Sequence, residues 1–124
     1  MTSSTPIAIF LQSLRDRNQE TRSDMAKNLG ITNAFLSAVE NGMKSAPESW
    51  VKKLKASYKL TDEEINTFNI CNMKSRPQSR IYWNRYSSKE KDILVPIIYY
   101  IHDMEDKDLR TLLEIADKYS KFNQ

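Results

Sequence analysis

Glycine is scarce in this sequence, and its two occurrences restrict where the chain can turn sharply. Gly30 and Gly42 are the only glycines among 124 residues, and each follows a stretch whose apolar residues recur at helical spacing. Glycine in such a place closes a helix, because it adopts the left-handed backbone without a steric penalty. The interval between them holds a short turn, one short helix and its C-terminal stop. We therefore expect two short consecutive helices joined by a tight turn.

Capping residues and apolar spacing predict further helices on both sides of this pair. Threonines precede four of the expected helices, and an N-cap threonine accepts a hydrogen bond from a backbone amide that lacks a helical partner. The expected starts are Thr5–Pro6, Thr21, Thr32, Pro47 and the capping box Thr61–Glu64. The residues expected on the buried faces are Ile7, Phe10, Leu11, Leu14, Met25, Ala26, Leu29, Ile31, Phe35, Leu36, Val39, Trp50, Val51, Leu54, Tyr58, Ile65, Phe68 and Cys71.

The composition changes at about Lys74. Five basic residues and no acidic residue occur from Lys74 to Lys89, with three aromatic residues between them. We interpret residues 74–88 as a linker. Its aromatic residues, Tyr82, Trp83 and Tyr86, together with the arginines, suit a stacking platform for nucleic acid. Such a cluster more often packs a linker against the helices, and the sequence leaves both interpretations open.

Two further helices are expected in residues 89–124. Ser88 is the expected cap of the first, which runs through the apolar block Ile93–Ile101, with Pro96 setting its start or a kink. A strand over this block has no second strand to pair with. The last helix is expected to bury Leu109, Leu112, Leu113, Ala116 and Tyr119, which repeat at three and four residues.

The composition argues against several classes of protein. The net charge of +3 permits an anionic partner without requiring one. One cysteine and one histidine form neither an intrachain disulfide nor a four-ligand zinc site. No phosphate loop or nucleophile–base pairing is visible, so we expect neither an enzyme nor a cofactor or metal. The longest apolar run is too short to span a bilayer, and the N-terminus does not resemble a secretion signal, so we expect a cytoplasmic protein.

The stretch from Leu14 to Pro47, LRDRNQETRSDMAKNLGITNAFLSAVENGMKSAP, carries the most specific pattern. A small residue on one helix, a glycine turn and an apolar pair three residues apart on the next helix are typical of a helix-turn-helix. Over roughly residues 7–70 the chain resembles the phage repressor/Cro (XRE-type) helix-turn-helix family. The resemblance implies a five-helix all-α bundle that binds operator DNA as a two-fold dimer. The residues in register are Ala26, Gly30, Leu36, Val39, Glu40, Asn41 and Gly42.

The resemblance also implies roles for particular residues. Arg15 and Glu40 occupy the places of an ion pair that fixes the first helix to the third. Arg22 is placed to contact a DNA phosphate at a helix N-terminus, and Asn41 and Lys44 are placed to contact the backbone. The positions implied to face the bases are Asn33, Ala34, Ser37 and Ala38.

Some of these residues also allow simpler interpretations. The family often carries Gln, Arg or Lys where this chain has Ala34 and Ala38, so direct reading of bases is expected to be sparse and DNA shape to contribute. An alternative interpretation of Asn33 and Ser37 is that they are ordinary surface residues. The lysines expected on the solvent-facing side of the fourth helix are Lys52, Lys53, Lys55 and Lys59.

The sequence predicts three parts: a helix-turn-helix DNA-binding domain in residues 1–73, the basic and aromatic linker, and a two-helix appendage in residues 89–124. The appendage has more apolar surface than two helices hide between them. It could dock on the bundle, but we favour homodimerisation through residues 89–120, because one helix-turn-helix needs a second to read two half-sites about 34 Å apart.

The expected function is sequence-specific binding of double-stranded DNA by a transcriptional repressor. The alternative is a protein-interaction module, an antitoxin or a phage-encoded inhibitor of a host defence protein. In that alternative, the C-terminal tail binds a protein partner and the helix-turn-helix is retained or reused.

Overall fold

The computed structural model describes residues 5–75 and 82–122, and the fold of these residues is all-α with no strand. The chain divides into two compact units, Met1–Ser79 and Arg80–Asn123, here called unit 1 and unit 2. Within the linker expected at residues 74–88, residues 76–81 lie outside the described residues. The two units are treated separately below.

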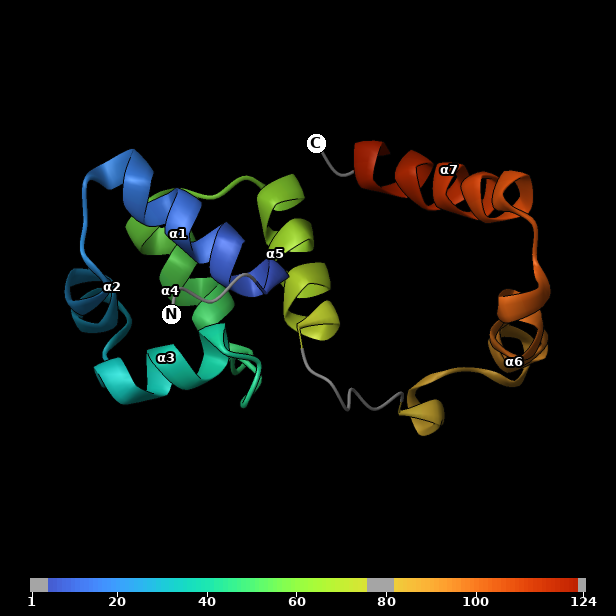
Figure 1. Ribbon diagram of the computed structural model, residues 1–124, viewed down its shortest axis with the longest axis horizontal. Helices are drawn as coiled ribbons and strands as arrows, with labels where there is room; N and C mark the ends of the chain where they lie inside the picture. Colours follow the sequence, from blue (N-terminus) through green and yellow to red (C-terminus); the bar gives the residue numbers. More distant parts are fainter. Residues whose placement is uncertain (1–4, 76–81, 123–124) are drawn as a thin grey trace. The chain divides into compact units, whose positions relative to one another are not determined.

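Five helices make up the described part of unit 1 (Figure 1). Figure 1 shows the two short helices α2 and α3 following one another around a tight bend, with α1, α4 and α5 forming the rest of the bundle. The helices are α1 (Pro6–Asn18), α2 (Arg22–Leu29), α3 (Asn33–Glu40), α4 (Ser49–Tyr58) and α5 (Asp62–Lys74).

The local signals for four of these helices are confirmed. The side chains of Thr5, Thr21, Thr32 and Thr61 each accept a hydrogen bond from a backbone amide in the first turn of the helix that follows. Gly30 has a φ angle of 67° and closes α2 in the left-handed conformation. The predicted glycine turn therefore lies between α2 and α3.

The start of α4 differs from the prediction. The helix begins at Ser49 rather than at Pro47, because the chain first makes a tighter turn. In that turn the carbonyl groups of Pro47 and Glu48 accept hydrogen bonds from Trp50 N (3.0 Å) and Val51 N (3.1 Å), each three residues later. No side chain caps this helix.

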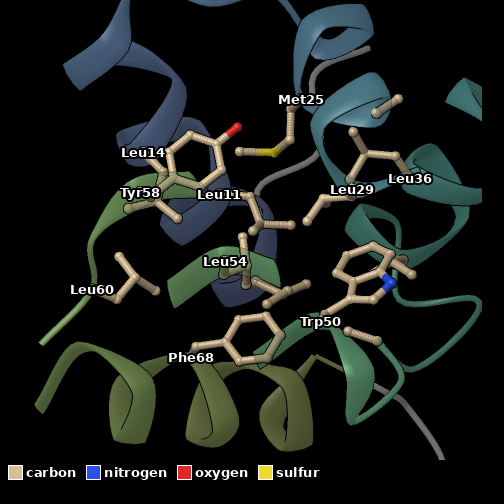
Figure 2. Packing of buried hydrophobic residues seen from close by; sticks show 14 residues of the cluster. Leu11, Leu14, Met25, Leu29, Leu36, Trp50, Leu54, Tyr58, Leu60 and Phe68 are labelled. Atoms are coloured by element: carbon tan, nitrogen blue, oxygen red, sulfur yellow. The ribbon is translucent and has the colours of Figure 1, made fainter. Parts of the chain in front are cut away.

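The core of unit 1 collects apolar side chains from all five helices (Figure 2). Trp50 and Phe68 are the largest of the fully buried side chains. Phe35 lies against Trp50 edge to face, with ring centroids 5.9 Å apart, and so ties α3 to α4. The buried cluster consists of Ile7, Leu11, Leu14, Met25, Ala26, Leu29, Leu36, Val39, Ala46, Trp50, Leu54, Tyr58, Leu60 and Phe68.

Polar contacts close the bundle where its first and last helices meet. Ser75 is buried, and its hydroxyl accepts a hydrogen bond from Ile7 N (2.8 Å) and donates one to Cys71 O (2.6 Å). Asn72 holds the loop before α4 through two bonds to the backbone of Ala46 (3.0 and 3.1 Å). The end of α5 is therefore bound to the start of α1.

Unit 2 contains two longer helices and two short 3-10 turns. The capping residue of α6 is Ser87, paired with Glu90 in a capping box, and the expected cap, Ser88, is instead the first helical residue. Pro96 lies inside α6 and does not set its start. The apolar block is helical, which excludes the strand interpretation. The elements are η1 (Trp83–Arg85), α6 (Ser88–Tyr100), η2 (Ile101–Asp103) and α7 (Asp106–Phe122).

Candidate nucleic-acid interface

The bend between α2 and α3 rests on a small residue and on backbone hydrogen bonds. Ala26 is 3% exposed, and its carbonyl accepts a hydrogen bond from Ile31 N at 2.9 Å. Lys53 donates to the carbonyl of Leu29 at the end of α2 (2.9 Å). This ammonium group satisfies a carbonyl that the helix leaves without a partner. Lys53 was expected on the solvent-facing side of α4, and its contact with Leu29 depends on tertiary packing that spacing does not reveal.

The third helix has one buried side and one accessible side. Leu36, Val39 and Glu40 are buried. Asn33 and Ala34 are exposed, and Ser37 and Ala38 are half-buried. The four residues implied to face the bases therefore lie on the accessible side, and the first turn of α3 is its most open part.

Asn33 at the start of α3 is held by a residue of α2. Its Nδ2 donates a hydrogen bond to Ser23 Oγ at 3.0 Å. An asparagine amide has a second hydrogen on the same nitrogen and a carbonyl oxygen that accepts. The contact with Ser23 thus fixes the orientation of the amide while these two groups remain able to meet a base edge. Ser23 was not among the predicted site residues, because its role depends on how α2 and α3 cross.

Glu40 is the centre of an ion-pair cluster at the inner end of α3. Its carboxylate is 1% exposed and lies 2.8 Å from Arg15 Nη2 and 2.9 Å from Arg22 Nε. The structure thus brings together Arg15 and Glu40, as the resemblance implied. Arg22 as a second partner was not foreseen, since its predicted role was contact with a phosphate.

The two arginines of this cluster differ in exposure. The Arg15 side chain is 3% exposed, and it also donates to Gln12 Oε1 (2.8 Å) and to the Met25 sulfur (3.4 Å). The Arg22 side chain is 43% exposed and stands at the first position of α2. Arg22 uses Nε toward Glu40, and the remaining hydrogens of its guanidinium group are on the terminal nitrogens. Arg15 is therefore a structural cation, and Arg22 also contributes positive charge at the surface.

An open hollow of about 280 Å³ lies beside Arg22. It is lined by Ala8, Ile9, Gln12, Ser13, Arg15, Asp16, Arg22 and Glu40. Ser13 is the one hydroxyl in this lining, and no imidazole or thiol accompanies it. The Ser13 hydroxyl donates its hydrogen to the carbonyl of Phe10 at 2.6 Å, so it is engaged within α1.

The other residues implied to contact phosphate follow α3. Asn41 caps the end of α3 and is exposed, with its Nδ2 3.5 Å from Ser37 Oγ. Lys44 is exposed, and its ammonium group lies 5.6 Å from the centre of the Phe35 ring. Contact with the aromatic ring limits the positions of this cation next to the accessible side of α3.

Three aromatic residues lie in or beside η1 of unit 2, namely Tyr82, Trp83 and Tyr86, and they make ring contacts. The Arg85 guanidinium lies 4.9 Å from the centre of the Tyr82 ring, and the Trp83 and Tyr86 rings are 6.2 Å apart. All three aromatic side chains are at least one-third exposed.

Among residues 5–75 and 82–122, no three acidic, histidine or cysteine side chains lie together as metal ligands would. In the same residues no helix combines the length and the apolar character needed to cross a membrane.

Comparison with family models, with curated proteins and with solved structures finds no match to this chain.

Proposed function

We propose that the protein is a sequence-specific DNA-binding transcriptional regulator, a repressor that acts as a dimer on operator DNA. The observation that carries the proposal is the accessible side of α3, which follows a tight glycine bend and offers no acidic side chain. The single acid of α3, Glu40, is buried and paired with two arginines. Phosphates therefore meet no exposed carboxylate on this helix, and a duplex can approach it.

The first turn of α3 supports direct reading of bases. Asn33 and Ala34 are its exposed side chains. An asparagine amide forms two hydrogen bonds with adenine in the major groove, and an alanine methyl group packs on the thymine methyl. Ser37 and Ala38 extend the same side with small, half-buried groups. With so few polar groups, the preference for a sequence would depend partly on the shape of the DNA.

Cations near α3 support contact with the phosphates. Arg22 stands at the N-terminus of α2, where the helix dipole and the arginine charge act in the same direction. Lys44 and Asn41 lie just beyond the other end of α3. These contacts would set the register of the helix on the duplex and give an affinity that falls steeply with salt.

The proposal also assigns roles to the helices of unit 1 and to those of unit 2. Unit 1 is taken as a repressor-like helix-turn-helix bundle, and the helices of unit 2 as the appendage that joins two copies. Two copies would read two half-sites about 34 Å apart and so occlude a promoter.

Matched charge substitutions test the proposal. Duplexes are first selected from a random pool at low ionic strength, and binding of the best duplex is then measured by fluorescence anisotropy. Ala34→Glu introduces a carboxylate on the accessible side of α3 and should weaken binding at least about 100-fold, since each lost contact costs about 1–3 kcal/mol. Ala56→Glu changes another exposed helical alanine, in α4, and should retain most of the affinity. The proposal is wrong if no duplex is selected, or if both variants bind alike.

One observation favours a second candidate, the protein-interaction module. Side chains of unit 2 whose burial is described are all at least partly exposed, and such apolar surface suits a protein partner. An antitoxin or an inhibitor would still form a stoichiometric complex with its partner when Ala34→Glu has removed DNA binding. A repressor that acts through DNA alone would form no such complex.

A further inference from the structure

The described part of unit 2 has no core of its own. No side chain is buried between Tyr82 and Ser120, the stretch of this unit over which burial is described. A chain of about 40 residues needs a disulfide, a metal or association with another surface to stay folded. An isolated helix of about 15 residues is only marginally stable in water. The helices of unit 2 therefore need an apolar surface from elsewhere.

The last helix, α7, concentrates its apolar residues on one side. Four of them follow one another at intervals of three, four and three residues, which is the spacing of a seam between two helices. Leu113 and Tyr119 are 62% and 68% exposed, and Leu109 and Leu112 are only half-buried. The α7 face consists of Leu109, Leu112, Leu113, Ala116 and Tyr119.

The sizes of these side chains match when two copies of α7 run antiparallel. In an antiparallel pair of helices, the first seam position of one helix faces the last seam position of the other. Leu109 then faces Tyr119 of the second copy, and Leu112 faces Ala116. A large side chain meets a small one in the inner layers, which lets the two helices approach closely.

The helix dipoles favour the antiparallel arrangement. In an antiparallel pair the N-terminus of one α7 lies beside the C-terminus of the other, so the two dipoles oppose one another. Parallel pairing would align the two dipoles unfavourably.

We propose that the α7 face pairs with the α7 face of a second copy of this chain, with the two helices antiparallel. Unit 1 of the same chain is the other surface that could cover the α7 face. Its described residues expose few large apolar side chains, namely Ile9, Met43, Ile70 and Met73. Of these, only Ile70 and Met73 share a helix at a helical interval. A second copy instead supplies an apolar stripe that matches in length and in the sizes of its side chains. The inference rests on the homodimer of the proposed function and names its interface.

Sedimentation velocity on the full-length chain without DNA tests the pairing. The wild-type protein should be a dimer at micromolar concentrations, a range usual for an interface of this small size. Leu112→Glu places a charge in the seam and should raise the dissociation constant at least about 100-fold. The matched variant Thr111→Glu adds the same charge one residue earlier, off the seam, and should remain a dimer. A wild-type chain that stays monomeric, or equal association of both variants, overturns the proposal.

Oxidative cross-linking in a Cys71→Ser background tests the direction of the helices. Leu109 faces Tyr119 of the second copy only in the antiparallel pair, so Leu109→Cys and Tyr119→Cys chains should form a disulfide with one another when they are mixed. Neither variant alone should cross-link with itself. Self-cross-linking of the single variants, without cross-linking between them in the mixture, overturns the antiparallel arrangement.

The same samples distinguish the proposal of DNA binding from the proposal of α7 pairing. They also distinguish α7 pairing from docking of α7 on unit 1 of the same chain. Ala34→Glu should lose DNA binding and keep the dimer mass, so the function and the interface fail independently. Hydrogen exchange detects docking of α7 on unit 1 of the same chain. A monomer whose α7 amides are protected would establish that arrangement and would overturn pairing with a second copy.

Discussion

The most constrained side chain of the molecule is Glu40. A carboxylate that is 1% exposed is costly unless its charge is compensated, and Arg15 and Arg22 both compensate it. The two arginines are not equivalent, because one is buried with the carboxylate and the other borders water. Loss of Arg15 would leave a buried charge with a weaker and more hydrated partner. Loss of Arg22 would remove only the half-exposed partner of the Glu40 carboxylate, and water could take the place of its guanidinium group.

Substitution of the two arginines should therefore have unequal effects on the free energy of unfolding. We expect Arg15→Ala to cost about 3–5 kcal/mol and Arg22→Ala about 1 kcal/mol or less, as measured by urea denaturation. Arg15→Met combined with Glu40→Leu should recover most of the loss, since an apolar pair needs no charge compensation. Equal losses for the two single variants would mean that burial does not govern this cluster.

Tyr58 gives the stability of unit 1 a dependence on alkaline pH. Burial raises the pKa of Tyr58 from 10.0 to about 12, and the Glu20 carboxylate, which accepts its hydroxyl hydrogen at 2.6 Å, adds to the shift. Because the folded pKa lies above the unfolded one, the native state retains the proton that the unfolded state loses. This contribution is present below pH 10 and is lost between about pH 10 and 12.

Tyr58→Phe should remove this dependence. Between pH 10 and 12 the free energy of unfolding of the wild-type protein should fall faster than that of the variant, by up to about 1.4 kcal/mol per pH unit. Urea denaturation at a series of pH values measures the difference, in which the titration of lysines common to both proteins cancels. Parallel pH profiles would show that the phenol titrates alike in the folded and unfolded states.

Helix by helix, the sequence predicts the elements better than their ends. Threonine caps and a left-handed glycine act within a single turn, so they can be recognised in the sequence without knowledge of the tertiary structure. The start of α4 depends on a turn at Pro47 that can form in more than one way. α1 ends at Gln19 and α4 ends at Lys59, and both residues have a positive φ angle although neither is a glycine. Glycine positions in the sequence therefore do not predict these two helix ends. Their conformation is imposed by the packing of the helices that they join.

Substitution at these helix ends should show the cost of the left-handed backbone. At Gly30 an added Cβ would meet only Lys53 Nζ, at 3.9 Å, so steric crowding is absent and the backbone alone sets the penalty. Gly30→Ala should destabilise unit 1 by about 1–2 kcal/mol. Gln19→Gly, at the same type of position, should instead be neutral or stabilise by less than about 1 kcal/mol. Thermal unfolding measures both, and a loss in both variants would contradict the backbone argument.

The candidate site was predictable only in part, and the reason lies in how it is assembled. The accessible positions of α3 follow from helical spacing and from the resemblance. The contacts of Ser23 with Asn33 and of Arg22 with Glu40 arise where α2 crosses the other helices. Side chains that meet across elements leave no periodic signal in a single sequence. The sequence therefore predicts which positions of α3 are accessible, but it does not reveal the side chains that orient them.

At the scale of the whole molecule, the two units differ in what keeps them folded. The described buried hydrophobic residues all belong to unit 1. Unit 1 therefore contains the interactions that stabilise it, whereas unit 2 depends on the surface that covers α7. Association follows mass action, so a unit that depends on it gains stability as the protein concentration rises. A self-contained unit does not.

Hydrogen exchange at two protein concentrations should separate these behaviours within one chain. Far below the dissociation constant of the dimer, amides of α7 should exchange at nearly the rate of an unfolded chain. In two samples that both exceed the dissociation constant, a 100-fold rise in concentration should slow these amides by about tenfold, because the dissociated fraction there falls roughly as the inverse square root of the concentration. Amides in the core helices of unit 1, such as those near Leu54, should exchange at the same slow rate in both samples. Leu112→Glu should abolish the concentration dependence in α7 and leave unit 1 unchanged. Protection of α7 that is equal at both concentrations would show that its stabilising surface lies within the same chain.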